Sequence, residues 1–150
     1  DRSEKRLHKV ILNAKRLGLS CLNFLQADSC NLLDKKPAWE NYFQKILIDA
    51  PCSGLGTLAR NPDARWRIKS SMLEELIILQ KKLLEGLLPL LAENGRIVYA
   101  TCTINPAENS QQIESFTKKH ANLKITSQKQ IWPGVDNLGD GFYAAIIDCT

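Results

Sequence analysis

Two of the five cysteines stand where a β-sheet would present them to a ligand. Cys52 follows the short apolar run 45–49, and Cys102 follows the similar run 96–100. Both runs are rich in β-branched residues, a pattern typical of buried strands. Ligands of open α/β sheets bind beyond the carboxyl ends of the strands. The sequence therefore predicts that these two thiols share one pocket, although they are distant along the chain.

Two thiols beside a carboxylate suit covalent catalysis on a pyrimidine ring. C5 of cytosine is not nucleophilic enough to accept a methyl group, but a thiolate that adds to C6 makes C5 enamine-like. An acidic group near N3 would support that addition, and a base must later remove the C5 proton so that the thiol can leave. A free thiol has a pKa of about 8.5 and must be activated. Arg60, Arg65 or a helix N-terminus could do this, and the sequence does not distinguish among them.

A plainer interpretation exists for every cysteine, because free cysteine often behaves as a small buried hydrophobe. We adopt it for Cys21, Cys30 and Cys149. The number of cysteines is odd, their spacing is wide, and C-x-x-C does not occur. These features disfavour a disulfide scaffold, a metal site and a thiol redox protein.

A loop over 50–71 combines positive charge with an aromatic ring, since it contains Arg60, Arg65, Trp66 and Arg67. Basic residues interleaved with an aromatic suit binding to an RNA backbone and stacking on its bases. The alternative is a solvated loop that one tryptophan anchors to the protein.

Three acidic residues occupy positions where nucleoside-binding folds hold a cofactor. Asp1 immediately precedes a predicted helix, and Asp28 and Asp49 each follow a predicted strand. A carboxylate at such a position can accept hydrogen bonds from ribose hydroxyls or an adenine edge. Taken singly, each is more often a turn or N-cap residue.

The elements that would position these residues alternate between helix and strand. Such alternation predicts an α/β fold with a mostly parallel sheet covered on both faces. Asn105, Pro106 and Glu108 form a strong helix start, in which Glu108 reaches back as in a capping box. The predicted elements are a helix over 3–17, strands over 22–26 and 45–49, a helix over 72–91, a strand over 96–100, a helix from 105 to about 120, a weak strand over 123–127 and a strand over 142–147.

Composition sets broad limits on the class of protein. The 150 residues are 44% hydrophobic and 24% charged, which fits one globular domain or a large piece of one. The net charge of +4 is weak evidence for a polyanionic partner. No run is long enough for a membrane span, and no export signal is visible. We therefore expect reduced thiols in the cytoplasm and no membrane partner.

Four segments resemble motifs of the RNA cytosine-5 methyltransferases, and within them the bacterial Sun/Fmu/RsmB type that acts on 16S ribosomal RNA. DAPCSGLG (49–56) with NPDARW (61–66) looks like motif IV, and YATCTINPAEN (99–109) looks like motif VI. DGFY (140–143) is similar to the C-terminal Asp-Gly-Phe-Phe. The motifs are long and specific, and the resemblance covers nearly the whole chain.

The resemblance implies a Rossmann-like methyltransferase fold with S-adenosylmethionine as the methyl donor. It implies that Cys102 is the nucleophile, that Cys52 assists product release, and that Asp1, Asp28 and Asp49 contact the cofactor. It also implies 16S ribosomal RNA as the partner of a monomeric, metal-free cytoplasmic enzyme. Position alone could not have shown which cysteine attacks.

One departure from the family pattern is important. In the family, a glycine-rich motif cradles the methionine end of the cofactor and would precede the position of Asp1. The first strands and an N-terminal RNA-binding region would also precede it, and the 150 residues include none of the three. We therefore expect 1–150 to be the C-terminal part of a catalytic domain, inactive by itself. The competing hypothesis is a non-catalytic RNA-binding or assembly module that keeps the fold.

Overall fold

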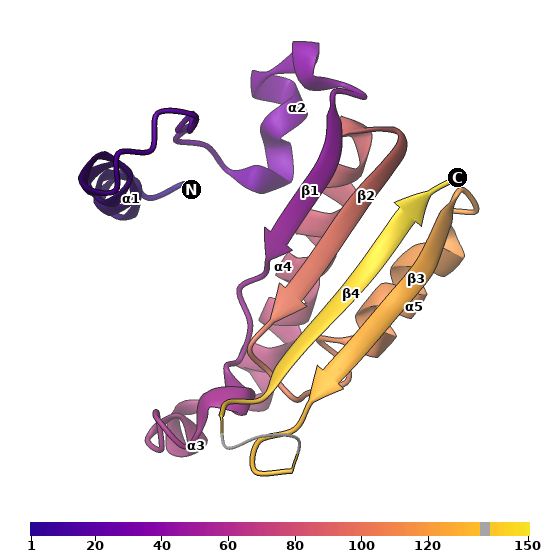
Figure 1. Cartoon of the computed structure of the whole chain (residues 1–150). Coiled ribbons are helices and arrows are strands. Elements are labelled where there is room, and N and C mark those ends of the chain that lie inside the picture. The colour runs from indigo at the N-terminus through magenta and orange to yellow at the C-terminus, as the bar shows by residue number, and fades with distance from the viewer. Residues whose placement is uncertain (136–138) are drawn as a thin grey trace.

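The computed structural model describes residues 1–135 and 139–150, and a twisted mixed sheet forms one of its layers (Figure 1). In the described residues the sheet has four strands in the order β1-β2-β4-β3. The strands are β1 (Phe43–Asp49), β2 (Leu91–Thr101), β3 (Leu123–Ile131) and β4 (Phe142–Cys149).

Strand direction confirms the predicted α/β class and refines it. β1 and β2 are parallel neighbours, with Asp49 opposite Ala100. β4 runs antiparallel to both β2 and β3, so three strands share one direction and β4 opposes them. The predicted adjacency of the two strands that precede Cys52 and Cys102 is confirmed.

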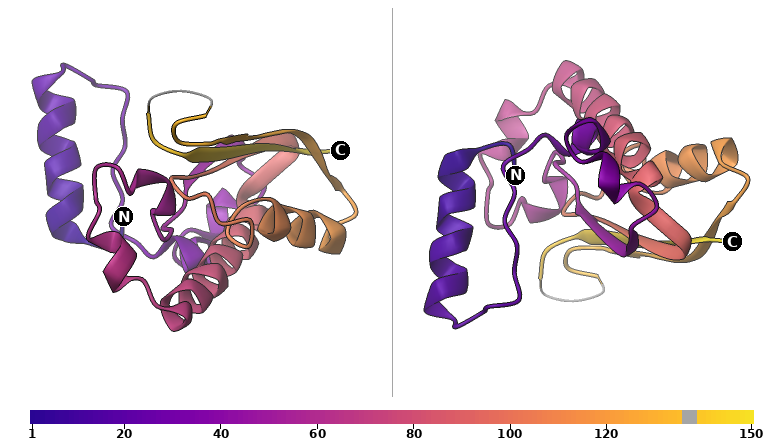
Figure 2. Two further views of the ribbon diagram at one scale, coloured as in Figure 1. Left: turned by 90° about the horizontal axis from the view of Figure 1, so that it is seen from below. Right: turned by 90° about the horizontal axis from the view of Figure 1, so that it is seen from above.

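Helices α4 (Ser70–Leu87) and α5 (Ser110–Lys119) cover one face of this sheet (Figure 2). The core between these layers contains fully buried side chains from the two central strands and from both helices. They include Ile97 and Tyr99 on β2, Ile147 on β4, Leu84 on α4 and Ile113 on α5. Burial of apolar area of this kind is the main stabilising contribution to such a domain.

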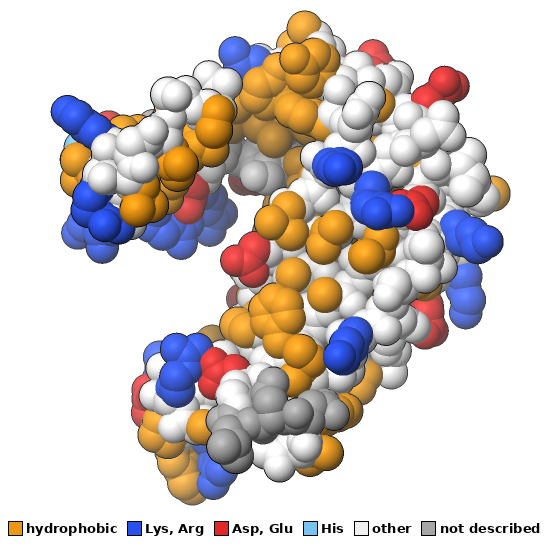
Figure 3. Space-filling model, viewed as in Figure 1, with side chains coloured by type: hydrophobic (Ala, Val, Ile, Leu, Met, Phe, Trp, Pro, Cys, Tyr) orange, Lys and Arg blue, Asp and Glu red, His pale blue; other side chains and the backbone are white. Residues whose placement is uncertain are grey.

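The opposite face is open in this chain, so the prediction of cover on both faces is wrong (Figure 3). Its central row runs from Leu47 through Val98 to Ile146, which are paired across the strands. Leu47 is 72% exposed. The face is open because α1 (Glu4–Arg16), which precedes β1, lies off the edge of the sheet (Figure 1).

The N-terminal arm, which we define as residues 1–28, is loosely attached. The predicted helix is confirmed as α1, capped by the Ser3 side chain. Its apolar side remains largely exposed, since Val10 is 49% accessible and only Ala14 is buried. The predicted strand over 22–26 is wrong, because none of the four described strands pairs with it to form a ladder. Asp1 is its neighbour instead, through hydrogen bonds of 3.2 Å to Leu25 O and from Ala27 N.

Short helices connect this arm and the loops to α4. α2 (Leu32–Lys35) follows the 3-10 turn Ser29–Asn31, whose backbone packs so closely on Gly86 that an added Cβ would lie 2.2 Å from Cys30 O. Further 3-10 turns are Pro37–Trp39, Leu55–Thr57 and Leu88–Leu90. The predicted loop over 50–71 also contains α3 (Ala64–Arg67).

Candidate active site

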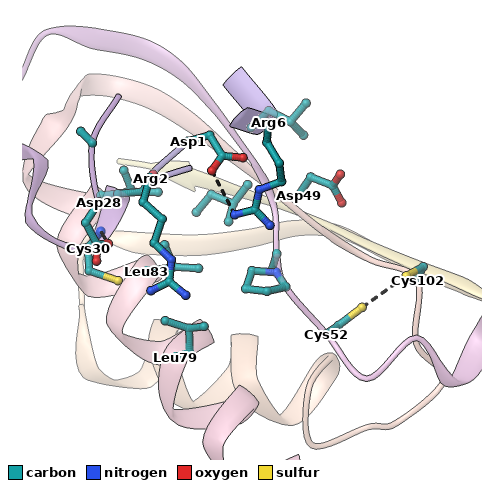
Figure 4. Close-up of a pocket in the computed structure, with 17 residues that line it drawn as sticks. Asp1, Arg2, Arg6, Asp28, Cys30, Asp49, Cys52, Leu79, Leu83 and Cys102 are labelled. Atoms are coloured by element: carbon teal, nitrogen blue, oxygen red, sulfur yellow. Dashed lines mark hydrogen bonds and ion pairs between the residues drawn. The ribbon is translucent and has the colours of Figure 1, made fainter. Parts of the chain in front are cut away.

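A cavity of about 590 Å³ runs from the N-terminal arm to the ends of β1 and β2 (Figure 4). Its size is in the range of small-molecule and cofactor sites. All five residues predicted for catalysis and cofactor binding line it, namely Asp1, Asp28, Asp49, Cys52 and Cys102. Figure 4 shows Asp1 and Asp28 toward one end and the two thiols at the other, which we call the thiol end.

The two sulfur atoms lie 3.4 Å apart, in hydrogen-bonding contact. The parallel register of β1 and β2 brings them together, since Ala50 N donates to Ala100 O at 2.9 Å just before the cysteines. Beyond them, Gly56 N donates to Cys102 O at 3.0 Å. The predicted shared pocket is therefore confirmed, although the separate role of each thiol stays a prediction.

Burial controls the protonation of Cys52, one of the two thiols. Burial, followed by the hydrogen bond with Cys102, raises the pKa of Cys52 to about 12. Cys52 therefore keeps its proton near neutral pH and can donate it toward the Cys102 sulfur. An acceptor that receives such a bond is the better placed of the two to act as a nucleophile.

The three carboxylates share the cavity but have different local partners. Asp1 accepts hydrogen bonds from Ser3 N at 2.7 Å and from Arg6 at 3.0 Å. Asp28 accepts from Cys30 N at 2.9 Å, and this backbone bond lowers the pKa of Asp28. Asp49 is exposed at the end of β1. Turn-capping and ligand binding are thus compatible for Asp1 and Asp28, because each still lines the cavity.

Two arginines in the lining were missed by sequence reasoning. Arg2 and Arg6 both line the cavity, and Arg6 pairs with Asp1 (Figure 4). In the sequence they belong to a basic helix, where a charged solvent-facing side is the usual explanation. Nothing in the spacing indicates that these two face the cavity.

The four residues predicted for RNA binding are divided by the structure. Arg60 forms an ion pair with Asp140, which raises the pKa of Arg60, and it lies within electrostatic range of Cys102. The other three are on α3, where Arg65 and Arg67 are exposed and Trp66 is 84% exposed. The alternative interpretation requires Trp66 to anchor the loop to the core, and a side chain this exposed does not do so.

Glu108 does not complete the predicted capping box. Helix α5 begins at Ser110, and the backbone amide of Asn105 donates to the Thr103 hydroxyl at 3.2 Å instead of to Glu108. Glu108 is fully buried and faces Ser53, the residue after Cys52. A contact between positions so distant in sequence could not be read from local spacing.

The remaining cysteines do not form one class. Cys21 is exposed, so its interpretation as a buried hydrophobe is wrong, whereas Cys30 and Cys149 are partly buried. Among residues 1–135 and 139–150, no cluster of three or more His, Cys, Asp or Glu side chains could hold a metal ion. Over the same residues, none of the helices has the length and apolar character required to cross a membrane.

Comparison with known proteins adds independent information. The family model for 16S rRNA methyltransferase RsmB/F matches residues 1–148. The chain is 40% identical to ribosomal RNA small subunit methyltransferase B of Enterobacter sp., and 38% identical to that of Serratia proteamaculans. These matches cover 97% of this chain but only 35% and 34% of the two relatives, so it spans about a third of their length.

Solved structures agree with this result. NSun6 from Pyrococcus horikoshii with SFG superposes with a TM-score of 0.83 at 25% identity, over 99% of this chain and 40% of that one. A methyltransferase homologue from the same organism gives a TM-score of 0.82 at 26% identity, over 100% of this chain and 52% of that one.

Proposed function

Because the chain belongs to the RsmB/F family of 16S rRNA methyltransferases, we propose that its thiol end methylates C5 of a cytidine in 16S ribosomal RNA. The activity is proposed for a protein of the family's full length, since this chain spans about a third of its relatives. The observation that carries the proposal is the pair of sulfur atoms 3.4 Å apart at the ends of adjacent parallel strands.

The cavity suits S-adenosylmethionine, which would supply the methyl group. Its volume of about 590 Å³ fits a nucleoside cofactor, and its carboxylates can accept hydrogen bonds from sugar hydroxyls and the adenine amino group. We assign Asp1, Asp28 and Asp49 to this role. The relative NSun6 was solved with SFG, which supports a ligand site in this fold.

At the thiol end, we assign Cys102 as the nucleophile that adds to C6. Cys52 retains its proton because burial raises its pKa to about 12, so its S–H can point at the Cys102 sulfur. Asp49, exposed at the strand end beside them, can support the addition through N3 of the base. Arg65, Trp66 and Arg67 on α3 would bind the flanking RNA by charge and stacking.

Product release reverses the addition, and here Cys52 has its second task. The C6–S bond breaks with its electron pair remaining on Cys102, while the C5 proton leaves to a base and the C5=C6 bond is restored. A proton donor 3.4 Å from the departing sulfur stabilises it. Loss of Cys52 should therefore slow release more than it slows addition.

The test compares cysteine variants of the protein made from the complete open reading frame. We expect Cys102→Ala to lower kcat by more than about 10³-fold, as removal of a covalent nucleophile does in other enzymes. Cys52→Ala should accumulate an RNA–protein adduct that survives denaturing electrophoresis, and the double variant should form none. Cys21→Ala is the control, because Cys21 is exposed and outside the cavity lining.

Undiminished methylation by Cys102→Ala would overturn the assignment of the nucleophile. RNA binding without any methylation by the unaltered protein would favour the non-catalytic module instead. We also propose that the 150-residue chain alone binds S-adenosylmethionine weakly and does not turn over, and titration calorimetry that gives micromolar affinity would contradict this.

A further inference from the structure

A fully buried carboxylate, that of Glu108, contacts the residues that directly follow the two cysteines. Glu108 Oε1 accepts from Ser53 N at 2.8 Å and from Gln80 Nε2 at 3.0 Å. Glu108 Oε2 accepts from Ser53 Oγ at 2.6 Å, from Thr103 Oγ1 at 3.2 Å and from Asn105 Nδ2 at 3.3 Å. Every one of these partners is able to donate a hydrogen bond.

Burial of the Glu108 carboxylate costs free energy that its surroundings must offset. Burial of a carboxylate without a cation is unfavourable and is tolerated only when several donors surround it. Among the described ion pairs, none includes Glu108. Its compensation is this set of neutral donors, and together they fix the carboxylate in one position.

The donors belong to the residues that flank the thiols. Ser53 follows Cys52, and Thr103 follows Cys102, so one carboxylate ties together the loops after both cysteines. The Ser53 and Thr103 hydroxyls also contact one another at 2.8 Å. Neither contact involves a sulfur atom, so the thiols remain free to face the cavity.

The positions before the cysteines are held by the same network. Gln80 Nε2, which contacts Glu108, also donates to Pro51 O at 2.9 Å, just before Cys52. On the other side Thr101 donates to Asn109 Oδ1 at 2.6 Å, while Asn109 donates to Thr103 O at 2.9 Å. Each cysteine is thus bracketed by residues whose hydrogen bonds lead to the pair Glu108 and Asn109.

From this geometry we propose that Glu108 is a positioning residue that fixes the separation and direction of the Cys52 and Cys102 thiols. The inference rests on the proposed function, because it assigns to Glu108 the task of keeping the nucleophile and its partner in reacting geometry. Glu108 acts through Ser53 and Thr103 and does not touch the substrate.

The chemistry of the network explains why glutamate is required. Both carboxylate oxygens receive at least two donors, whereas glutamine has one acceptor oxygen and would place its amide hydrogens against Asn105 Nδ2. Aspartate keeps both oxygens but is shorter by one methylene, so it cannot reach Ser53 while remaining in the turn before α5. The two variants therefore probe charge and reach separately.

The experiment uses the protein of the complete open reading frame with Glu108→Asp, Glu108→Gln and the control Glu114→Gln, which removes an exposed carboxyl from α5. We expect Glu108→Asp to lower kcat by about 10²-fold, as misplacement by roughly 1 Å does elsewhere, with KM for RNA little changed. Glu108→Gln should show a smaller loss, and Glu114→Gln none.

A second readout reports the thiol geometry without methylation. Diamide accepts two electrons and two protons from a pair of thiols, forming a disulfide, and peptide mapping gives the rate for Cys52 with Cys102. We expect Glu108→Asp to slow this oxidation severalfold. In the double variant Ser53→Ala, Glu108→Gln, the oxidation rate should fall by less than the two single effects combined.

The outcomes separate the two proposals. An inactive unaltered protein defeats the proposed function, while the oxidation rates still decide whether Glu108 positions the thiols. Unchanged kcat and unchanged oxidation in folded Glu108→Asp overturn the positioning role. Should Glu108→Asp fail to fold, Glu108→Gln decides: a lowered kcat at an unaltered Tm supports the inference, and an unaltered kcat overturns it.

Discussion

The thiol end of the cavity is held by buried hydrogen bonds over a packed core, whereas the N-terminal arm at its other end rests on exposed contacts. Behind the thiols, Ile97 and Tyr99 on β2 are fully buried, and the Glu108 network joins the loops. In the arm, Val10 remains 49% accessible, and the ion pair between Arg6 and Asp1 is partly exposed.

This difference indicates how the two ends behave. Segments with few buried apolar contacts open locally at low free energy, whereas core strands open only with global unfolding. The geometry of the two thiols therefore depends on the sheet and on the buried Glu108 network. The geometry of Asp1 and Asp28 depends on a segment that the rest of the described chain holds weakly, and a ligand or further protein could order it.

The largest expected effect is on stability and compares one side chain from each region. Ile97→Ala truncates a fully buried side chain on β2 and should lower the free energy of unfolding by about 2–5 kcal/mol. Val10→Ala on α1 should change it by less than about 0.5 kcal/mol, because that side chain is half exposed. Urea denaturation of the 150-residue chain measures both.

Similar losses for the two variants would show that α1 is packed as firmly as the sheet, and would remove the contrast between the regions. A change in the m-value for Val10→Ala would instead point to an altered denatured state.

A second prediction uses the pH behaviour of the thiols. The folded pKa of Cys52, raised by burial to about 12, lies above the value of about 8.5 for an unfolded thiol. At pH 8 the fraction of Cys52 present as thiolate is therefore about 10³-fold smaller in the native chain than in the unfolded chain. The native thiolate is more nucleophilic, which offsets part of this difference. Iodoacetamide should therefore modify Cys52 about thirtyfold more slowly in the native chain than in the urea-unfolded chain.

The raised pKa of Cys52 also determines how the free energy of unfolding changes with pH. Because the folded pKa is the higher one, the contribution of Cys52 is fully present below about pH 8.5 and is lost as pH rises toward 12. Cys21 in the arm is the internal control, since it is exposed and should react similarly in the native and unfolded chains. Equal native rates for Cys21 and Cys52 would contradict the raised pKa of Cys52.

The same contrast explains what could be predicted from the sequence. Period and composition correctly placed β1, β2 and β4, and strand adjacency then placed Cys52 beside Cys102. Those inferences depend on local patterns and on a general rule for parallel sheets. They held because β2 and β4 are buried against the helices along much of their length, and β1 pairs with β2 in parallel register.

The errors fall where a contact is distant in sequence or a neighbour is missing. The run 22–26 has strand-like composition, but a strand also needs a partner strand, and in the described part of the chain its backbone partner is Asp1. Glu108 fits a capping box by spacing, yet Ser53, far away in sequence, competes for its carboxylate. Spacing along the chain carries no information about either competitor.

The smallest expected effect would sharpen the contrast by separating local from global stability. Arg6 pairs with Asp1 across an exposed surface, and such pairs contribute roughly 0–1 kcal/mol, so Arg6→Ala should barely move the urea midpoint. Asp1 O nevertheless accepts a hydrogen bond from Ala27 N, at the other end of the N-terminal arm. Amide exchange at Ala27 should therefore accelerate severalfold in Arg6→Ala, while amides of β2 stay protected.

Lys9→Ala is the matched control, because it removes a positive charge from α1 without altering the cavity lining. If β2 amides also exchanged faster in Arg6→Ala, the arm and the sheet would open as one unit, and the thiol geometry would depend on the arm after all.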